Sequence, residues 1–179
     1  MRPLPVLTVG MLLDGTPMQL TAELAGLFVA HQLWYLAEGA PITPTLAYEL
    51  VDGTRQITRI MMEDAQAAVE YGEEWLAENP EHATRAVLIA DGFITLDERK
   101  IDAVIFQCRC YVEPVGALAG AVPYRPKDDA RGFAIYPLQF LELDEEVTDT
   151  RMLGDAFFAG ADRHDHAAQL WDELFEESF

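Results

Sequence analysis

Side chains that can bind a metal crowd together once, near the end of the chain. Asp162, His164 and His166 combine a carboxylate with two imidazoles, a set that suits zinc or a similar ion. Asp162 is also well placed as the N-cap of a helix, with Asp165 in the first turn. On such a helix the two rings would point about 200° apart, because successive residues rotate by about 100°. We therefore expect these three candidates to bind no metal unless the segment is extended.

The two cysteines, Cys108 and Cys110, are the available thiol ligands for a soft metal or a redox reaction. No second cysteine pair and no nearby histidine follows them, so a closed tetrahedral site is incomplete. Their surroundings predict a strand, in which both thiols point to one face and pack in the core. A disulfide between them needs a geometry that a flat strand does not supply, and free thiols favour a reducing compartment.

The chain's one cluster of basic residues lies close to Tyr124 if the strands pair as expected: Arg109, Arg125, Lys127 and Arg131. Arginine holds a carboxylate through two parallel hydrogen bonds. Arg109, Arg125, Tyr124 and Asp91 are therefore candidate residues for binding an anionic ligand. The alternative is that the bases form ion pairs at the rim of the sheet with Asp128, Asp129 and Glu113.

Motifs of catalysis and of cofactor binding are missing from the sequence. There is no nucleophile elbow, no phosphate-binding glycine loop, no dinucleotide fingerprint and no H-E-x-x-H pair. His31 lies inside the first predicted helix, where a hydrogen-bonded core role is more typical than catalysis. We predict no catalytic residue and no cofactor.

The charge balance is the most unusual property of the chain. Its 31 acidic residues face 12 basic ones, which gives a formal net charge of −19. A field of this sign repels nucleic acids and anionic membrane surfaces, so neither is an expected partner. The excess acid either keeps the protein soluble, as in many bacterial proteins, or forms a docking surface for a basic protein.

Helical and strand patterns alternate along 179 residues, enough for one domain. Thr16 and Gln19 predict a capping box for a first helix that ends at Gly39. A second helix is expected over residues 62–79, and two short ones over 149–159 and 163–176. Strands are expected over residues 46–51, 54–61, 84–96, 101–112, 115–125 and 132–143. Asp91 and Gly92 indicate either a turn or a bulge within one long strand, and we favour the bulge.

These patterns predict one α+β domain over residues 1–179, an antiparallel sheet of about five or six strands with helices mainly on one face. Residues 1–13 do not resemble a signal peptide, and Glu23, His31 and Gln32 interrupt the most apolar stretch. We expect a cytoplasmic protein.

Three functions fit the sequence, and we favour a non-catalytic protein-binding module of the inhibitor or immunity type. Its acidic surface would hold a basic protein, and the candidate partner-binding residues are Glu70, Glu74, Glu78, Trp75 and Trp171. The alternative is an enzyme or small-ligand binder with a pocket over the sheet, formed by the four anion-binding candidates. A self-assembling structural subunit is the third possibility, and both a monomer and a homodimer remain open.

Overall fold

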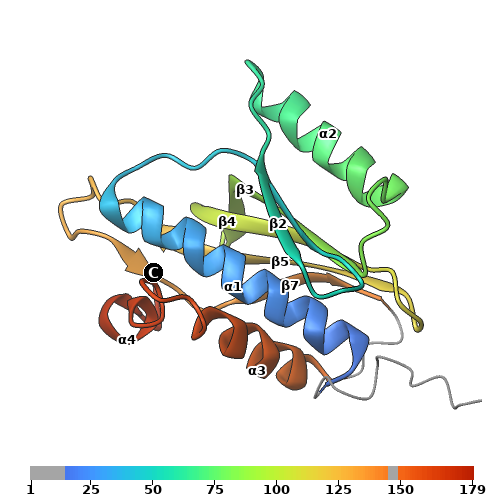
Figure 1. The fold of residues 1–179 in the computed structure, drawn as a ribbon. Coiled ribbons are helices and arrows are strands. Elements are labelled where there is room, and N and C mark those ends of the chain that lie inside the picture. The colour runs from blue at the N-terminus through green and yellow to red at the C-terminus, as the bar shows by residue number, and fades with distance from the viewer. Residues whose placement is uncertain (1–14, 145–148) are drawn as a thin grey trace, which may run out of the picture.

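A computed structural model describes residues 15–144 and 149–179 of the chain, and its centre is a seven-stranded sheet (Figure 1). The strands follow the order β2-β1-β3-β4-β5-β6, β7 also pairs with β5, and all these pairings are antiparallel. The bounds are β1 (Thr45–Glu49), β2 (Arg55–Arg59), β3 (Arg85–Leu96), β4 (Arg99–Cys110), β5 (Gly116–Arg125), β6 (Ala134–Ile135) and β7 (Gln139–Leu143). The predicted α+β class with one antiparallel sheet is confirmed.

Helix α1 (Pro17–Glu38) begins and ends where its sequence signals placed it. The Gln19 backbone N–H donates to the Thr16 hydroxyl, and the Thr16 N–H donates to the Gln19 side chain, which closes the capping box. Gly39 ends the helix at φ 86°, a left-handed conformation that glycine adopts without steric cost. Helix α1 covers one face of the sheet, and the main core lies between them, including Leu24, Val29, Leu33, Val87, Val104 and Phe106.

Helix α3 (Thr150–Ala161) lies beside α1 on this face, as Figure 1 shows. Two glycines bring the two backbones into direct contact. A Cβ added to Gly26 would lie 1.7 Å from the carbonyl oxygen of Phe157, and one added to Gly160 would lie 1.9 Å from that of Glu23. Such close approach is open only to glycine, and it permits weak Cα–H···O contacts between helices.

Helix α2 (Ala65–Glu78) packs on the opposite face of the sheet. The alternation along β3 separates the two faces: Val87 and Ile89 belong to the core under α1, whereas Ala86 and Leu88 belong to the cluster under α2. Because α4 (Leu170–Leu174) contributes Leu170 and Leu174 to the core under α1, α2 alone lies on the far face among the described helices. The helices are therefore mainly on one face, as expected.

Strands β3 and β4 pair over their full 12 residues each, around a turn at Asp97 and Glu98 with positive φ angles of 50° and 64°. Two left-handed residues are typical of a type I′ hairpin turn. Asp91 and Gly92 stay in regular register, opposite Val104 and Ala103, so the bulge expected there is wrong. Gly92 instead makes room for a neighbouring side chain, since an added Cβ would lie 2.8 Å from Cδ1 of Ile105.

Two predicted elements after residue 131 are shorter than expected. The strand expected over residues 132–143 is divided into β6 and β7, with Pro137 between them, because proline cannot donate a ladder hydrogen bond. The helix expected over residues 163–176 is reduced to α4. Asp162 is the C-cap of α3 and not an N-cap.

The side chain of His164 caps the turns that follow α3. Its Nδ1 accepts hydrogen bonds from the backbone N–H groups of His166 and Ala167, at 3.2 and 3.0 Å. A side chain that accepts from the N–H groups two and three residues later is typical of an N-cap, so His164 marks the start of new turns and not the interior of one long helix.

Across the described segments, no helix has the length and apolar character needed to cross a bilayer.

Candidate functional site

Helix α2 is held to the sheet by one side only. The Asp64 carboxylate accepts from the N–H groups of Gln66 and Ala67 and so caps its start. Its buried residues, Ala68, Gly72, Trp75 and Leu76, follow one stripe. Gly72 sets the close distance to the sheet, because an added Cβ would lie 2.4 Å from Cδ1 of Leu88. The opposite side of the helix is left free to face solvent.

That outer side carries a row of exposed carboxylates. Glu70, Glu74 and Glu78 recur every four residues and therefore lie above one another, and Glu73 is exposed beside them. Five ion pairs occur within residues 15–144 and 149–179, and none of them includes an acid of α2. Their hydrogen bonds are to amides, from Gln66 to Glu70 and from Gln107 to Glu73 at 2.6 Å. The charge of this row is not offset by bases.

Large apolar side chains are exposed on α2 and just before it. Tyr71 is 52 % exposed and lies three residues before Glu74, hence beside it on the helix surface. Met61 and Met62, just before α2, are 78 % and 51 % exposed. We use the term acidic face for the set Met61, Met62, Glu70, Tyr71, Glu73, Glu74 and Glu78.

The two tryptophans proposed as anchors do not belong to this surface. Trp75 is 9 % exposed, and its ring packs against Tyr48 with centroids 4.8 Å apart. Trp171 is half-buried against Phe157 and Phe158, far from α2 in the sequence and on the other side of the sheet. An anchor must be exposed before binding, whereas both of these rings pack against apolar side chains of the protein itself. Tyr71 has the exposure that they lack, and its position outside the buried stripe is the signal that sequence reasoning missed.

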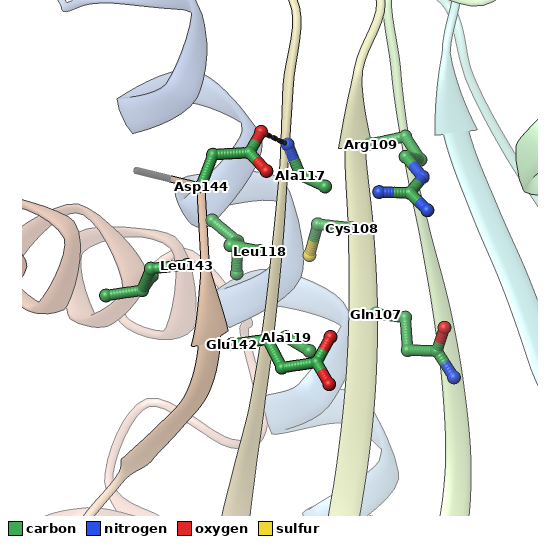
Figure 2. A pocket seen from close by; sticks show the side chains of 9 residues that line it. All are labelled: Gln107, Cys108, Arg109, Ala117, Leu118, Ala119, Glu142, Leu143 and Asp144. Carbon is green, nitrogen blue, oxygen red and sulfur yellow. Dashed lines mark hydrogen bonds between the residues drawn. The ribbon is translucent and has the colours of Figure 1, made fainter. Parts of the chain in front are cut away.

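Arg109 lies on the α2 face of the sheet, apart from the other three anion-binding candidates. It lines a shallow pocket of about 160 Å³ over β4, β5 and β7 (Figure 2). One of the two carboxylates at this pocket is engaged by the backbone: Asp144 accepts from the Ala117 N–H at 2.6 Å, the dashed line in Figure 2. Glu142 is on β7, and its carboxylate reaches over β5 toward Gln107 in Figure 2. It forms no ion pair with Arg109 among the described residues.

Tyr124 and Asp91 meet on the opposite, α1 face. The Tyr124 hydroxyl donates to Oδ1 of Asp91 at 2.7 Å. Partial desolvation raises the pKa of the Asp91 carboxyl, and repulsion from Asp102 adds to the shift, while the hydrogen bond from Tyr124 opposes it. Desolvation, with the bond to Asp91, also raises the pKa of Tyr124. The sequence candidates are thus brought together here as a pair.

Arg125 is buried at the edge of the sheet and holds a carboxylate of the chain itself. Its Nη1 and Nη2 donate to the two oxygens of Glu176 at 2.8 and 2.7 Å. The expected two-pronged chemistry is present, but the partner is a residue 51 positions away and not a rim acid. Arg131 does pair with Asp129 at 3.1 Å, as the alternative interpretation expected. The four ligand candidates are therefore divided between two faces and one edge.

The metal-ligand candidates take structural roles. His164 Nε2 lies 2.8 Å from Nδ1 of His31, and His166 stacks on Trp34. Since His164 Nδ1 already accepts two backbone bonds, its Nε2 carries the proton and donates to His31. Asp162 caps α3, as described above. Within residues 15–144 and 149–179, no three metal-binding side chains are grouped to hold an ion.

Comparisons with protein-family models, with curated proteins and with solved structures find no match for this chain. The acidic face is therefore weighed on its geometry alone. It combines a row of carboxylates outside all five ion pairs of the described residues with an exposed aromatic ring on the same helix.

The histidine pair predicts a loss of stability in mild acid. Burial is the main cause that lowers the pKa of His31, and repulsion from His164 and Arg59 adds to the shift. Burial also lowers the pKa of His164, where repulsion from His166 adds to the shift and Asp165 opposes it. As the pH falls below about 6.5, the unfolded chain binds protons that the folded chain refuses, so stability present at neutral pH is lost. We expect urea unfolding at pH 5.5 to require less urea than at pH 7.5.

His31→Gln keeps an acceptor for His164 and removes one titrating ring, so it should reduce the difference in stability between pH 5.5 and pH 7.5. His82→Asn is the control, because it removes an exposed histidine at φ 52°, a conformation that asparagine tolerates. Equal pH slopes for both variants and the original protein would show that the His31–His164 contact does not set the acid response.

Proposed function

We propose that this protein is a non-catalytic binding module that holds a basic protein on the acidic face of α2. The observation that carries the proposal is the coincidence of unpaired carboxylates with the exposed Tyr71, Met61 and Met62. Interfaces gain most of their affinity from a few aromatic anchors, and Tyr and Met are enriched in them. Surrounding charge speeds the encounter and selects a partner of opposite sign.

The rigid mounting of α2 supports this role. Because Trp75, Leu76 and Gly72 fix the helix against β3, the backbone of α2 is already ordered before binding, which lowers the entropy cost of association. A masking protein of the inhibitor or immunity type has this physical form. We place it in the cytoplasm, a proposal that the two free, buried cysteines support.

Charge reversal on the face should remove the partner. We expect Glu70→Lys/Glu74→Lys/Glu78→Lys to weaken capture of the basic partner at least tenfold, because attraction becomes repulsion at three contacts. Tyr71→Ala should leave the association rate unchanged but shorten the lifetime of the complex by about tenfold. The measurement is affinity capture from native lysate at about 0.05 M and about 0.5 M salt, followed by surface kinetics with the captured protein.

The matched control is Asp155→Lys/Asp172→Lys/Glu173→Lys, which changes the net charge equally at exposed residues of α3 and α4. It should retain the partner. If both triple variants lose it to the same degree, binding follows net charge and the acidic face has no special role. Sedimentation of the same samples measures whether the chain is a monomer or a homodimer.

A further inference from the structure

Basic side chains are scarce in this chain, yet four of its 12 lysines and arginines line one pocket of about 250 Å³: Arg99, Lys100, Arg125 and Arg131. Aromatic rings complete the lining, from Tyr124, Tyr136 and Phe179. Two carboxylates also line it, Asp102 and Asp129, and Asp129 is engaged by Arg131, so bases remain in excess. The pocket lies at the β5–β6 edge of the sheet, away from α2, and its charge is opposite to that of the acidic face.

The segment of residues 175–179 binds along this edge in the manner of an added strand. Phe175 forms a parallel bridge with Ile135 of β6, and the Glu176 N–H donates to the Ile135 carbonyl at 2.9 Å. Glu176 enters the two-pronged pair with Arg125, and the Phe179 ring lies 4.4 Å from that of Tyr136. Backbone pairing with side chains in adjacent pockets is how sheet edges recognise extended peptides.

The receptor side of this contact is far better fixed than the segment. The Arg125 side chain is only 7 % exposed and is oriented by Gly132 O, at 2.8 Å from Nε, and by the Tyr136 hydroxyl, at 3.1 Å from Nη1. A guanidinium in such a place requires a carboxylate. Glu176, in contrast, is 44 % exposed, Phe175 is exposed, and α4 just before them has no buried residue.

We propose that the Arg125 site, defined as Arg99, Arg125, Tyr136 and the edge of β6 at Ile135, binds an extended acidic segment of a partner protein. That segment carries a glutamate or aspartate in the place of Glu176 and an aromatic residue three positions later, in the place of Phe179. Residues 175–179 are the chain's own competitor for the site. Because an attached competitor acts at millimolar effective concentration, it sets the affinity that a partner must exceed.

The test uses the full chain with its own segment weakened. Glu176→Gln/Phe179→Ala leaves every residue of the site in place, and Glu177→Gln/Ser178→Ala is the matched control at exposed neighbours. The probe is a fluorescein-labelled peptide LFEESF, identical to residues 174–179, followed by anisotropy. We expect it to bind the first variant at least tenfold more tightly than the control or the original chain. Peptide LFQESF should bind at least tenfold more weakly than LFEESF, and LFEQSF should match LFEESF.

Equal binding to all three proteins, or equal binding of LFQESF and LFEESF, would overturn the proposal. If the double variant does not fold by circular dichroism, Phe179→Ala alone replaces it, with a gain over the original chain of at least threefold expected and no gain contradicting the site. Dimerisation of the original chain that Glu176→Gln abolishes would assign the site to a second copy and overturn the partner assignment. The result is independent of the variants of the acidic face.

Discussion

Gly160→Ala should destabilise the protein by about 3 kcal/mol, a lowering of the melting temperature by about 10 °C, because overpacking at a backbone contact cannot be relieved by a rotamer change. The added methyl would lie 1.9 Å from the Glu23 carbonyl oxygen, so α3 would have to move away from α1 as a unit. That movement would also loosen Phe157, which is fully buried and stacks on Phe106 with centroids 5.3 Å apart. Urea and thermal unfolding followed by circular dichroism measure the loss.

The same helix supplies the control. A Cβ added to Gly154 meets nothing within 4 Å, and its φ is not in the left-handed region. Gly154→Ala should therefore stabilise the protein by about 0.5–1 kcal/mol, through helix propensity and a less flexible unfolded chain. If Gly160→Ala behaved like Gly154→Ala, the direct contact between the backbones of α1 and α3 would be refuted.

Glu49→Gln should cost about 3–5 kcal/mol, because it leaves a buried cation without its counter-charge. Arg85 is buried, its Nη1 lies 3.2 Å from Oε1 of Glu49, and its Nε has no hydrogen-bond partner. Arg55 binds the other carboxylate oxygen, with Nε 2.8 Å from Oε2. The glutamine variant would thus hold two arginines around a neutral amide. Chemical unfolding at neutral pH measures the cost.

Arg55→Gln is the matched change at the exposed end of the same three-residue cluster. The Arg55 side chain is 37 % exposed, and removing it keeps the pair of Glu49 with Arg85 intact. We expect a cost of about 0–1 kcal/mol, as for surface ion pairs. Similar losses for Glu49→Gln and Arg55→Gln would mean that Arg85 is solvated well enough not to need its partner.

Local signals predicted the parts of this fold that local interactions form. The capping box at Thr16 and Gln19, the stop at Gly39 and the pairing of the long central strands follow from neighbouring residues, and the structure has all of them. The segment after residue 161 has apolar residues at helical spacing but departs from a helix. There the side chain of His164 caps the following turns and its ring contacts His31 in α1, a contact between residues 133 positions apart.

The candidate sites divide in the same way. The acidic row of α2 could be derived from helical spacing, and the same spacing places Tyr71 outside the buried stripe and Trp75 within it. The partner of Arg125 could not be derived, since Glu176 reaches it only because the chain returns to the edge of β6. Contacts between residues so far apart in sequence leave no periodic pattern.

Cys108 and Cys110 lie on β4 with a neighbouring strand paired on each side, both thiols are free and buried, and Cys108 belongs to the core under α1. Burial also raises the pKa of the Cys108 thiol, which keeps it in the unreactive form. Alkylating reagents consequently reach Cys108 only when β4 separates from its neighbours or from α1, whereas opening of the strand end suffices for Cys110, the last residue of β4. The rate at which Cys108 is labelled therefore measures opening of the native core, and mass spectrometry can follow it without any introduced probe.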